Sequence, residues 1–251
     1  MQRGISYNGF LPVRGEASPS STMLTQILFG ESFNILNSDG LWLLIELDTD
    51  SSEAWVARDG VHVINDAEEL KEEPPGKEIM AVHPIVSVRD KQYERDILLP
   101  AGSVLKNNGR FAKISEKGWI QAGADIDIKK VGEGLLSIPG LHGGRCGFGF
   151  DAPGLVKMLC KCLGIDVPHS ITGQSLPGSS INFLSEAQNG DLAFFHNNDD
   201  LIIHVGMVLE GGKIIHVTDQ VRIDKLDQQG IYCEEKGNYT HQLRVVKSIK
   251  S

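Results

Sequence analysis

The sequence predicts an α+β fold in which two small β-barrels precede a helix and an antiparallel sheet. Two strand-rich stretches, residues 1–64 and 79–130, repeat the same order of features. One amphipathic helix is expected near residue 152, and strand-type runs follow it. Helices and strands that are grouped along the chain, instead of alternating, are typical of α+β folds.

The two strand-rich stretches share a strand with Val-Arg, a turn at a glycine, and a closing strand with a tryptophan. These features are Val13-Arg14, Gly30 and Trp55 in the first stretch, and Val88-Arg89, Gly102 and Trp119 in the second. Short strands with turns at this spacing predict small barrels. Residues 65–78 are acidic and contain Pro-Pro-Gly, which predicts a short helix and then a linker. Residues 131–251 form the third predicted unit.

Composition excludes several classes of function. The chain has 251 residues, with 33 acidic and 24 basic side chains and a net charge of −9, so neither nucleic acid nor a membrane is an expected partner. It contains no apolar run of the length that a membrane helix needs. Its first nine residues contain no apolar segment of the signal-peptide type, and we expect a cytoplasmic protein. The four cysteines are too few for a disulfide scaffold and are expected to be reduced.

The helix of the third unit is expected to begin at Ala152. Asp151 is a good N-cap residue, Pro153 suits the first turn, and Gly164 suits the position after the helix. Apolar residues recur at helical spacing between these ends and predict one buried face. A glycine-rich loop, residues 140–149, precedes the helix.

Two histidines lie on neighbouring predicted strands, which are expected at residues 191–195, 201–209, 213–217 and 243–249. His204 and His216 are separated by the turn Glu210-Gly211-Gly212. A two-residue loop would place the histidines on opposite faces. A three-residue loop pairs Leu209 with Lys213 and makes the two rings diagonal neighbours on one face. We expect the odd-length loop, with both rings beside the N-terminus of the helix.

A series of short motifs resembles one known family. The motifs are Gly143-Gly144-Arg145, Phe148-Gly149-Phe150-Asp151, Gly154-Leu155-Val156, Gly190-Asp191-Leu192-Ala193-Phe194-Phe195, Ile203-His204-Val205-Gly206 and Ile214-Ile215-His216. Together they resemble the NlpC family of papain-like cell-wall peptidases. The two barrels resemble the bacterial SH3-like pair of the cytoplasmic γ-D-glutamyl-L-diamino-acid endopeptidases of that family. The resemblance implies a papain-like third domain and a murein peptide, or a related small molecule, as ligand.

The resemblance also assigns catalytic roles. In the family the helix opens with Asp-Cys-Ser-Gly, and the cysteine attacks the γ-glutamyl amide. His204 matches the general base, and His216 matches the residue that orients it. The nucleophile position is Ala152, whose methyl group cannot attack a carbonyl. The family mechanism is therefore not expected to operate.

Positions that would hold the substrate depart from the family pattern as well. Pro153 replaces a serine that helps to hold the peptide's free amine, and Ser170 lies where an aspartate meets the same amine. His142 replaces a tryptophan, and Ser52 lies near the usual place of a substrate-facing tyrosine. Such accumulated changes favour natural loss of function over a single engineered inactivation.

Two acidic residues of the same expected pocket, Glu16 and Asp151, are retained. The leading interpretation is a degenerate, inactive member of the family that is kept as a binding or regulatory protein, without a cofactor or a metal. One alternative is an active cysteine peptidase, in which Ala152 is an engineered substitution or Cys146 acts as the nucleophile. Another is a zinc site formed by His142, Cys146 and the two hairpin histidines. A third is a scaffold that binds an unspecified protein partner.

Overall fold

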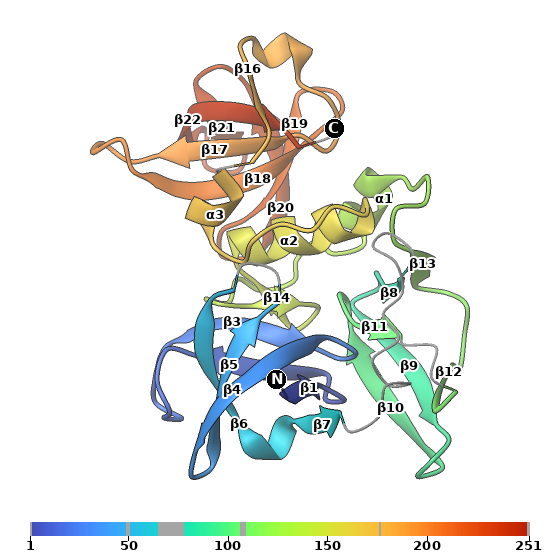
Figure 1. Cartoon of the computed structure of the whole chain (residues 1–251). Helices are drawn as coiled ribbons and strands as arrows, with labels where there is room; N and C mark the ends of the chain where they lie inside the picture. The colour runs from blue at the N-terminus through green and yellow to red at the C-terminus, as the bar shows by residue number, and fades with distance from the viewer. Residues whose placement is uncertain (1, 49–50, 65–77, 106–108, 176, 250–251) are drawn as a thin grey trace.

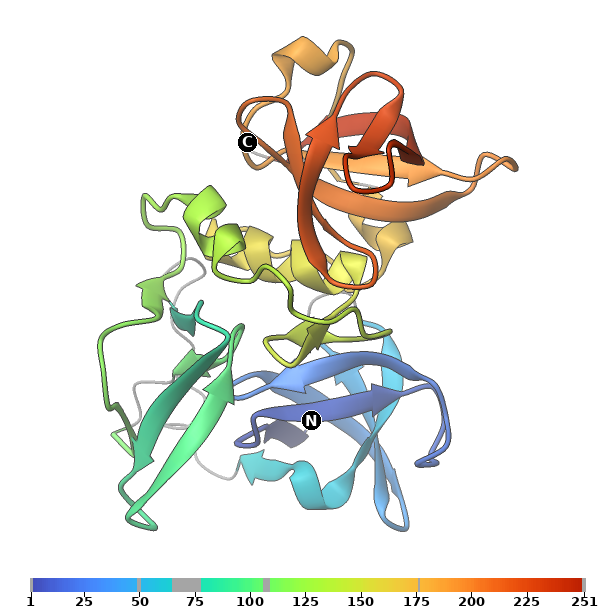
Figure 2. The ribbon, with the colours of Figure 1, turned by 180° about the vertical axis from the view of Figure 1, so that it is seen from behind.

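The computed structural model describes residues 2–48, 51–64, 78–105, 109–175 and 177–249 (Figure 1). Two β-rich units lie side by side at one end of the molecule, and a strand-rich unit forms the other end. Helix α2 (Ala152–Cys162) lies between them in both views (Figure 2). The predicted helix and linker of residues 65–78 fall, apart from Glu78, outside the described residues. Among the described residues, no helix has the length and apolar character that crossing a membrane requires.

The first unit is a seven-stranded antiparallel sheet with the strand order β3-β2-β6-β5-β4-β1-β7. Its strands are β1 (Gln2–Ile5), β2 (Phe10–Arg14), β3 (Met23–Leu28), β4 (Ser32–Asp39), β5 (Trp42–Leu47), β6 (Glu53–Ala57) and β7 (His62–Ile64), with a 3₁₀ turn, η1 (Arg58–Gly60), before β7. Alternate residues of β2, Leu11 and Val13, are buried with Phe33, Ile45 and Val56. This alternation is the two-residue period of a strand with one face on a core.

The second unit contains two three-stranded sheets. Their orders are β10-β9-β12 and β11-β8-β13. The strands are β8 (Ile79–Ala81), β9 (Ile85–Asp90), β10 (Arg95–Pro100), β11 (Val104–Leu105), β12 (Phe111–Lys113) and β13 (Trp119–Gln121). Phe29 of the first unit is fully buried in this core with Val88, Leu99 and Phe111. At Gly30, with φ +83°, a Cβ atom would lie 2.0 Å from the Val104 carbonyl oxygen, so only glycine allows this close contact between the two units.

The third unit combines short helices with a closed sheet. Its elements are α1 (Ile128–Glu133), β14 (Arg145–Cys146), β15 (Gly149–Phe150), α2, α3 (Ile171–Ser175), β16 (Ser179–Ile181), η2 (Leu184–Glu186), β17 (Leu192–His196), β18 (Ile202–Leu209), β19 (Lys213–Val217), β20 (Val221–Leu226), β21 (Gly230–Cys233) and β22 (Asn238–Ser248). The sheet order is β16-β22-β17-β18-β19-β20-β21, and β21 also pairs with β22, which closes six strands into a ring. The predicted α+β class is confirmed.

Helix α2 begins and ends where the sequence predicts. The Asp151 side chain accepts a hydrogen bond of 2.7 Å from the Gly154 N–H, and Gly164 follows the last turn with φ +77°. The prediction of a single buried face was too narrow, because α2 packs between the sheet and the second unit. Met80 belongs to the same buried cluster as Val205, on the other side of the helix.

A buried charge cluster joins the first unit to the loop before α2. Glu31 accepts hydrogen bonds from the Arg145 guanidinium and, at 3.3 Å, from Lys161 Nζ. The backbone N–H of Arg145 also donates to Gln26 Oε1 at 3.0 Å. Although burial alone would raise the pKa of Glu31, Arg145 and Lys161 lower it to about 2. The loop that carries the helix N-terminus is therefore fixed against β3 by charge-assisted hydrogen bonds.

Candidate active site

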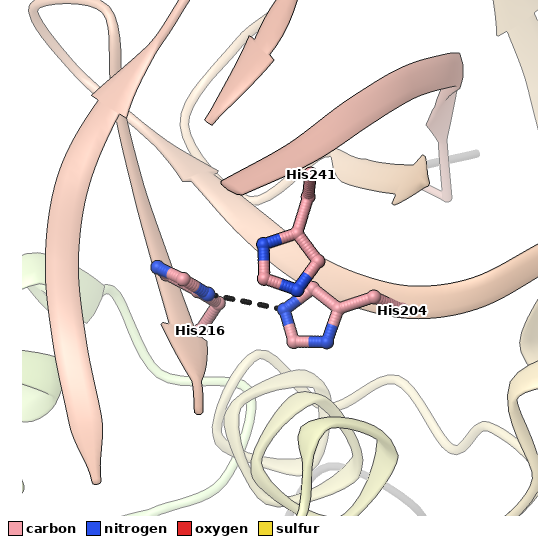
Figure 3. A group of neighbouring side chains, drawn as sticks. All are labelled: His204, His216 and His241. Atoms are coloured by element: carbon pink, nitrogen blue, oxygen red, sulfur yellow. Dashed lines mark hydrogen bonds between the residues drawn. The ribbon is translucent and has the colours of Figure 1, made fainter. Parts of the chain in front are cut away.

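The β18–β19 hairpin brings the two predicted histidines together. Leu209 pairs with Lys213 across a three-residue loop, as the alternation argument predicts. His204 Nε2 lies 3.0 Å from His216 Nδ1, and the two rings meet nearly at right angles (Figure 3). Both side chains are buried. The prediction that they share one face of the hairpin is confirmed.

The pair of histidines continues into a charged network on β20. His216 Nε2 lies 3.1 Å from Asp224 Oδ2, and Arg222 Nε donates to the same oxygen at 3.0 Å. Arg222 also donates to Glu235 at 2.9 Å. The hydrogen bond from His216 is the main cause that lowers the pKa of Asp224 to about 2, and Arg222 lowers it further. Asp224 is thus a carboxylate that can only accept hydrogen bonds.

This network assigns the protons on the rings. Because Asp224 accepts, Nε2 of His216 donates. In the tautomer of His216 that carries its proton on Nε2, Nδ1 is an acceptor, and His204 Nε2 then donates the hydrogen bond between the rings. Nδ1 of His204 keeps its lone pair. That arrangement presents one basic nitrogen of His204 and uses His216 and Asp224 to orient the ring.

A third histidine completes the cluster. His241 on β22 stacks on His204, with ring centroids 4.1 Å apart and the planes inclined by 22° (Figure 3). Its Nδ1 lies 2.9 Å from the Thr240 hydroxyl. Burial lowers the pKa of His204 well below its usual range, and His241 and His216 lower it further. Burial likewise lowers the pKa of His241 to about 4, with a further contribution from His216. His204 and His241 are therefore neutral at pH 7.

Ala152 is the first residue of α2 and is 8 % exposed. It belongs to the same buried cluster as Val205, which neighbours His204 on β18. The N-terminus of an eleven-residue helix would lower the pKa of a thiol placed here, but the methyl group offers nothing that the dipole could activate. The N-terminus of α2 thus carries no side chain that could act as a nucleophile.

Cys146 and His142 do not join the histidine cluster. Cys146 is on β14, fully buried, and burial raises the pKa of its thiol. His142 is exposed. Over the described part of the chain, the group of side chains placed to share a metal consists of His204, His216 and His241, so the expected ligand set with His142 and Cys146 is wrong. All four cysteines are free and buried, as predicted.

The other predicted site residues have local structural partners. Both carboxylate oxygens of Asp151 are occupied, one by Gly154 and the other by the Gly143 N–H at 2.8 Å. The Ser170 hydroxyl accepts from the Gly173 N–H at 3.1 Å at the start of α3. The Pro153 carbonyl accepts from Gln174 Nε2 at 2.9 Å.

Glu16 and Ser52 lie in turns of the first unit. Glu16, between β2 and β3, is exposed, and its backbone N–H donates to the Ser21 hydroxyl at 3.0 Å. Ser52 precedes β6, and its carbonyl accepts from the Leu47 N–H at 3.0 Å. The loop before α2 does approach this side of the first unit, since a Cβ atom at Gly143 would lie 2.4 Å from the Met23 carbonyl oxygen.

The sequence interpretation missed two members of the cluster, Asp224 and His241. It expected the last strand to begin at residue 243, whereas β22 begins at Asn238 and includes His241. It assigned no strand around Asp224, although Val221 and Ile223 alternate with polar residues at the start of β20. Alternation of apolar and polar residues indicates both strands, but it does not indicate which side chains face His204.

Comparison with known proteins agrees with this geometry. Residues 139–238 match the NlpC/P60 family, and residues 9–62 match the bacterial SH3 domain. The chain carries an NlpC/P60 domain preceded by a bacterial SH3 domain. His204, His216 and Asp224 lie inside the NlpC/P60 match, and His241 lies three residues beyond it.

Curated relatives of this NlpC/P60 protein are peptidases. The chain is 28 % identical over 217 residues to the γ-D-glutamyl-L-lysine dipeptidyl-peptidase of Bacillus subtilis (strain 168), covering 76 % of this chain and 71 % of the relative. It is 32 % identical over 147 residues to the protein of the same name from Bacillus cereus (strain ATCC 10987), covering 55 % of this chain and 43 % of the relative. The two proteins are homologues of this chain.

Solved structures share the whole arrangement. An NlpC/P60 family protein from Bacillus cereus superposes with a TM-score of 0.79 at 18 % identity, covering 98 % of this chain and 99 % of that one. An NlpC/P60 endopeptidase from Photobacterium damselae subsp. piscicida gives a TM-score of 0.67 at 15 % identity, covering 97 % and 70 %. At these identities the likeness shows the fold.

Proposed function

We propose that this protein is a degenerate member of the NlpC/P60 family that binds murein peptides without cleaving them. The observation that carries the proposal is Ala152 as the first residue of α2 in a chain that keeps the hydrogen-bonded His204–His216–Asp224 network. A peptidase of this type needs a thiolate to form the acyl intermediate, and no proton transfer by His204 replaces it.

Cys146 is a poor substitute for the missing nucleophile. Its side chain is fully buried, and burial raises the pKa of its thiol. Cys146 lies on β14, where it pairs with Gly149 of β15. A displaced nucleophile has to meet the substrate at about 3–3.5 Å in line with the base, and a buried, protonated thiol does neither.

The expected ligand follows from the curated homologues, whose names specify the γ-D-glutamyl-L-lysine bond. The histidine network that would face the scissile amide is retained here, whereas a chain kept only as a scaffold would have no use for a buried polar network of this kind. These observations support a bound murein peptide at the helix end more than an unspecified protein partner.

Calorimetric titration with the tripeptide L-Ala-γ-D-Glu-L-Lys tests this proposal. In buffer with a chelator, we expect saturable binding with a dissociation constant in the range of enzyme substrates, about 1 μM to 1 mM. Mass spectrometry of the recovered tripeptide should show it intact. His204→Ala should weaken binding, while His83→Ala, at an exposed turn of the second unit, should not. A wild-type protein that binds no tripeptide contradicts the binding role, and a cleaved tripeptide contradicts the loss of activity.

A further inference from the structure

We propose that His204, His216 and His241 form a binding site for a divalent transition metal of the zinc class. The three side chains come from three strands of the closed sheet, β18, β19 and β22, and lie next to one another (Figure 3). One nitrogen of each ring lies within 4.8 Å of the other two. This site goes beyond the proposed peptide binding and does not depend on it.

The spacing of the first two ligand atoms already suits a metal. Two imidazole nitrogens bound at about 2.0–2.1 Å to one tetrahedral zinc ion are about 3.3 Å apart. His204 Nε2 and His216 Nδ1 are 3.0 Å apart, so a small separation of the rings makes room for the ion. In this change the proton between the rings leaves Nε2 of His204, which binds in its other tautomer.

His241 would have to move more than His204 and His216 to bind the same ion, and its partial exposure leaves room for this movement. The ring of His241 is stacked on His204 and must tilt out of that stack to direct a nitrogen at the same point. His241 is only half-buried, unlike the other two histidines.

The hydrogen-bond partners of His216 resemble those that hold a histidine ligand in place at a metal centre. A ligating histidine usually donates its other ring nitrogen to a carboxylate, which fixes the tautomer. His216 binds Asp224 in this way through Nε2, and Arg222 holds Asp224 in place. Three histidines leave the fourth position of zinc open for water or an added ligand, as in catalytic zinc sites.

Two measurements on the full chain test the metal site. Addition of Co²⁺ to the wild type, followed by visible spectroscopy, should give the d–d absorption of a low-symmetry four- or five-coordinate ion. Calorimetry with Zn²⁺ should give one site per chain. The ligand variant is His241→Phe, which keeps a stacking ring but has no nitrogen, and the matched control is His83→Phe on the surface. Circular dichroism checks that each variant is folded.

The expected result is a loss of zinc affinity of at least about tenfold in His241→Phe, and no loss in His83→Phe. If His241→Phe does not fold, His241→Gln replaces it. Absence of the Co²⁺ absorption from the wild type overturns the proposal whatever the variants do. Zinc affinity that is equal in His241→Phe and the wild type also overturns it, because the ion would then be bound elsewhere.

Discussion

The Ala152→Cys variant is expected to react with iodoacetamide much faster than the wild type and still to cleave L-Ala-γ-D-Glu-L-Lys poorly. A cysteine here would lie at the N-terminus of α2, where the helix dipole favours a thiolate. The wild-type cysteines are all buried and should react slowly. Reactivity is measured by mass spectrometry of the alkylated chain.

Turnover requires more than a thiolate, because the γ-carbonyl must be held about 3–3.5 Å from sulfur. From the family resemblance we expect the groups that hold the free amine to be missing at Pro153, Ser170 and Ser52, and the Ser170 hydroxyl already accepts a hydrogen bond from the Gly173 N–H. Two or three missing polar contacts at about 0.5–1.5 kcal/mol each reduce turnover by one to several orders of magnitude. The rate should rise when Pro153→Ser and Ser170→Asp are added. If Ala152→Cys alone reached the rate of the Bacillus subtilis homologue, the expected loss of the substrate-holding groups would be contradicted.

Glu31→Gln is expected to lower the free energy of unfolding by about 3 kcal/mol. The substitution leaves Arg145 and Lys161 without their shared carboxylate in a site where both are largely buried, and an uncompensated buried charge costs about 3–5 kcal/mol. Urea unfolding measures the loss. The control is Asp96→Asn, which removes an exposed ion pair with Arg89 at 2.9 Å and should cost less than about 1 kcal/mol. Equal effects of the two variants would contradict the importance of the buried cluster.

The same carboxylate gives the fold a defined sensitivity to acid. The pKa of Glu31 is about 2 in the folded chain and 4.5 without its surroundings, so the group stabilises the fold above pH 4.5 by about 3 kcal/mol. That contribution decreases as the pH falls toward 2, because the unfolded chain then binds the proton more readily. The pKa of Asp224 is also lowered to about 2, so this carboxylate likewise stabilises the fold less as the pH falls. The difference in stability between the wild type and Glu31→Gln should therefore shrink between pH 5 and pH 2.

The parts of the site that depend on local geometry could be predicted from the sequence. The loop Glu210-Gly211-Gly212 fixes the pairing of Leu209 with Lys213, and this pairing brings His204 to His216. The cap at Asp151 is equally local, because its partner is three residues away. In both cases a few neighbouring residues determine the geometry.

Other features depend on contacts between distant segments. His241 reaches His204 through the pairing of β17 with β22, whose register shifts between Phe194 and Phe195, and no local pattern reports that shift. Arg145 and Glu31 are separated by 114 residues, and the sequence does not show that two charged side chains meet inside the molecule. The packing of Met80, from the second unit, in the buried cluster of α2 is another contact between distant segments.

Hydrolysis of L-Ala-γ-D-Glu-L-Lys by the wild-type chain is the most direct test of the central claim, that Ala152 leaves a peptidase fold without its nucleophile. The protein is incubated with the tripeptide, with and without prior alkylation by iodoacetamide, and released lysine is quantified against a protein-free blank. We predict that lysine release equals the blank in both samples, and that Cys146→Ser behaves like the wild type. Lysine release above the blank that alkylation abolishes would contradict the claim, and its loss in Cys146→Ser would identify Cys146 as the nucleophile.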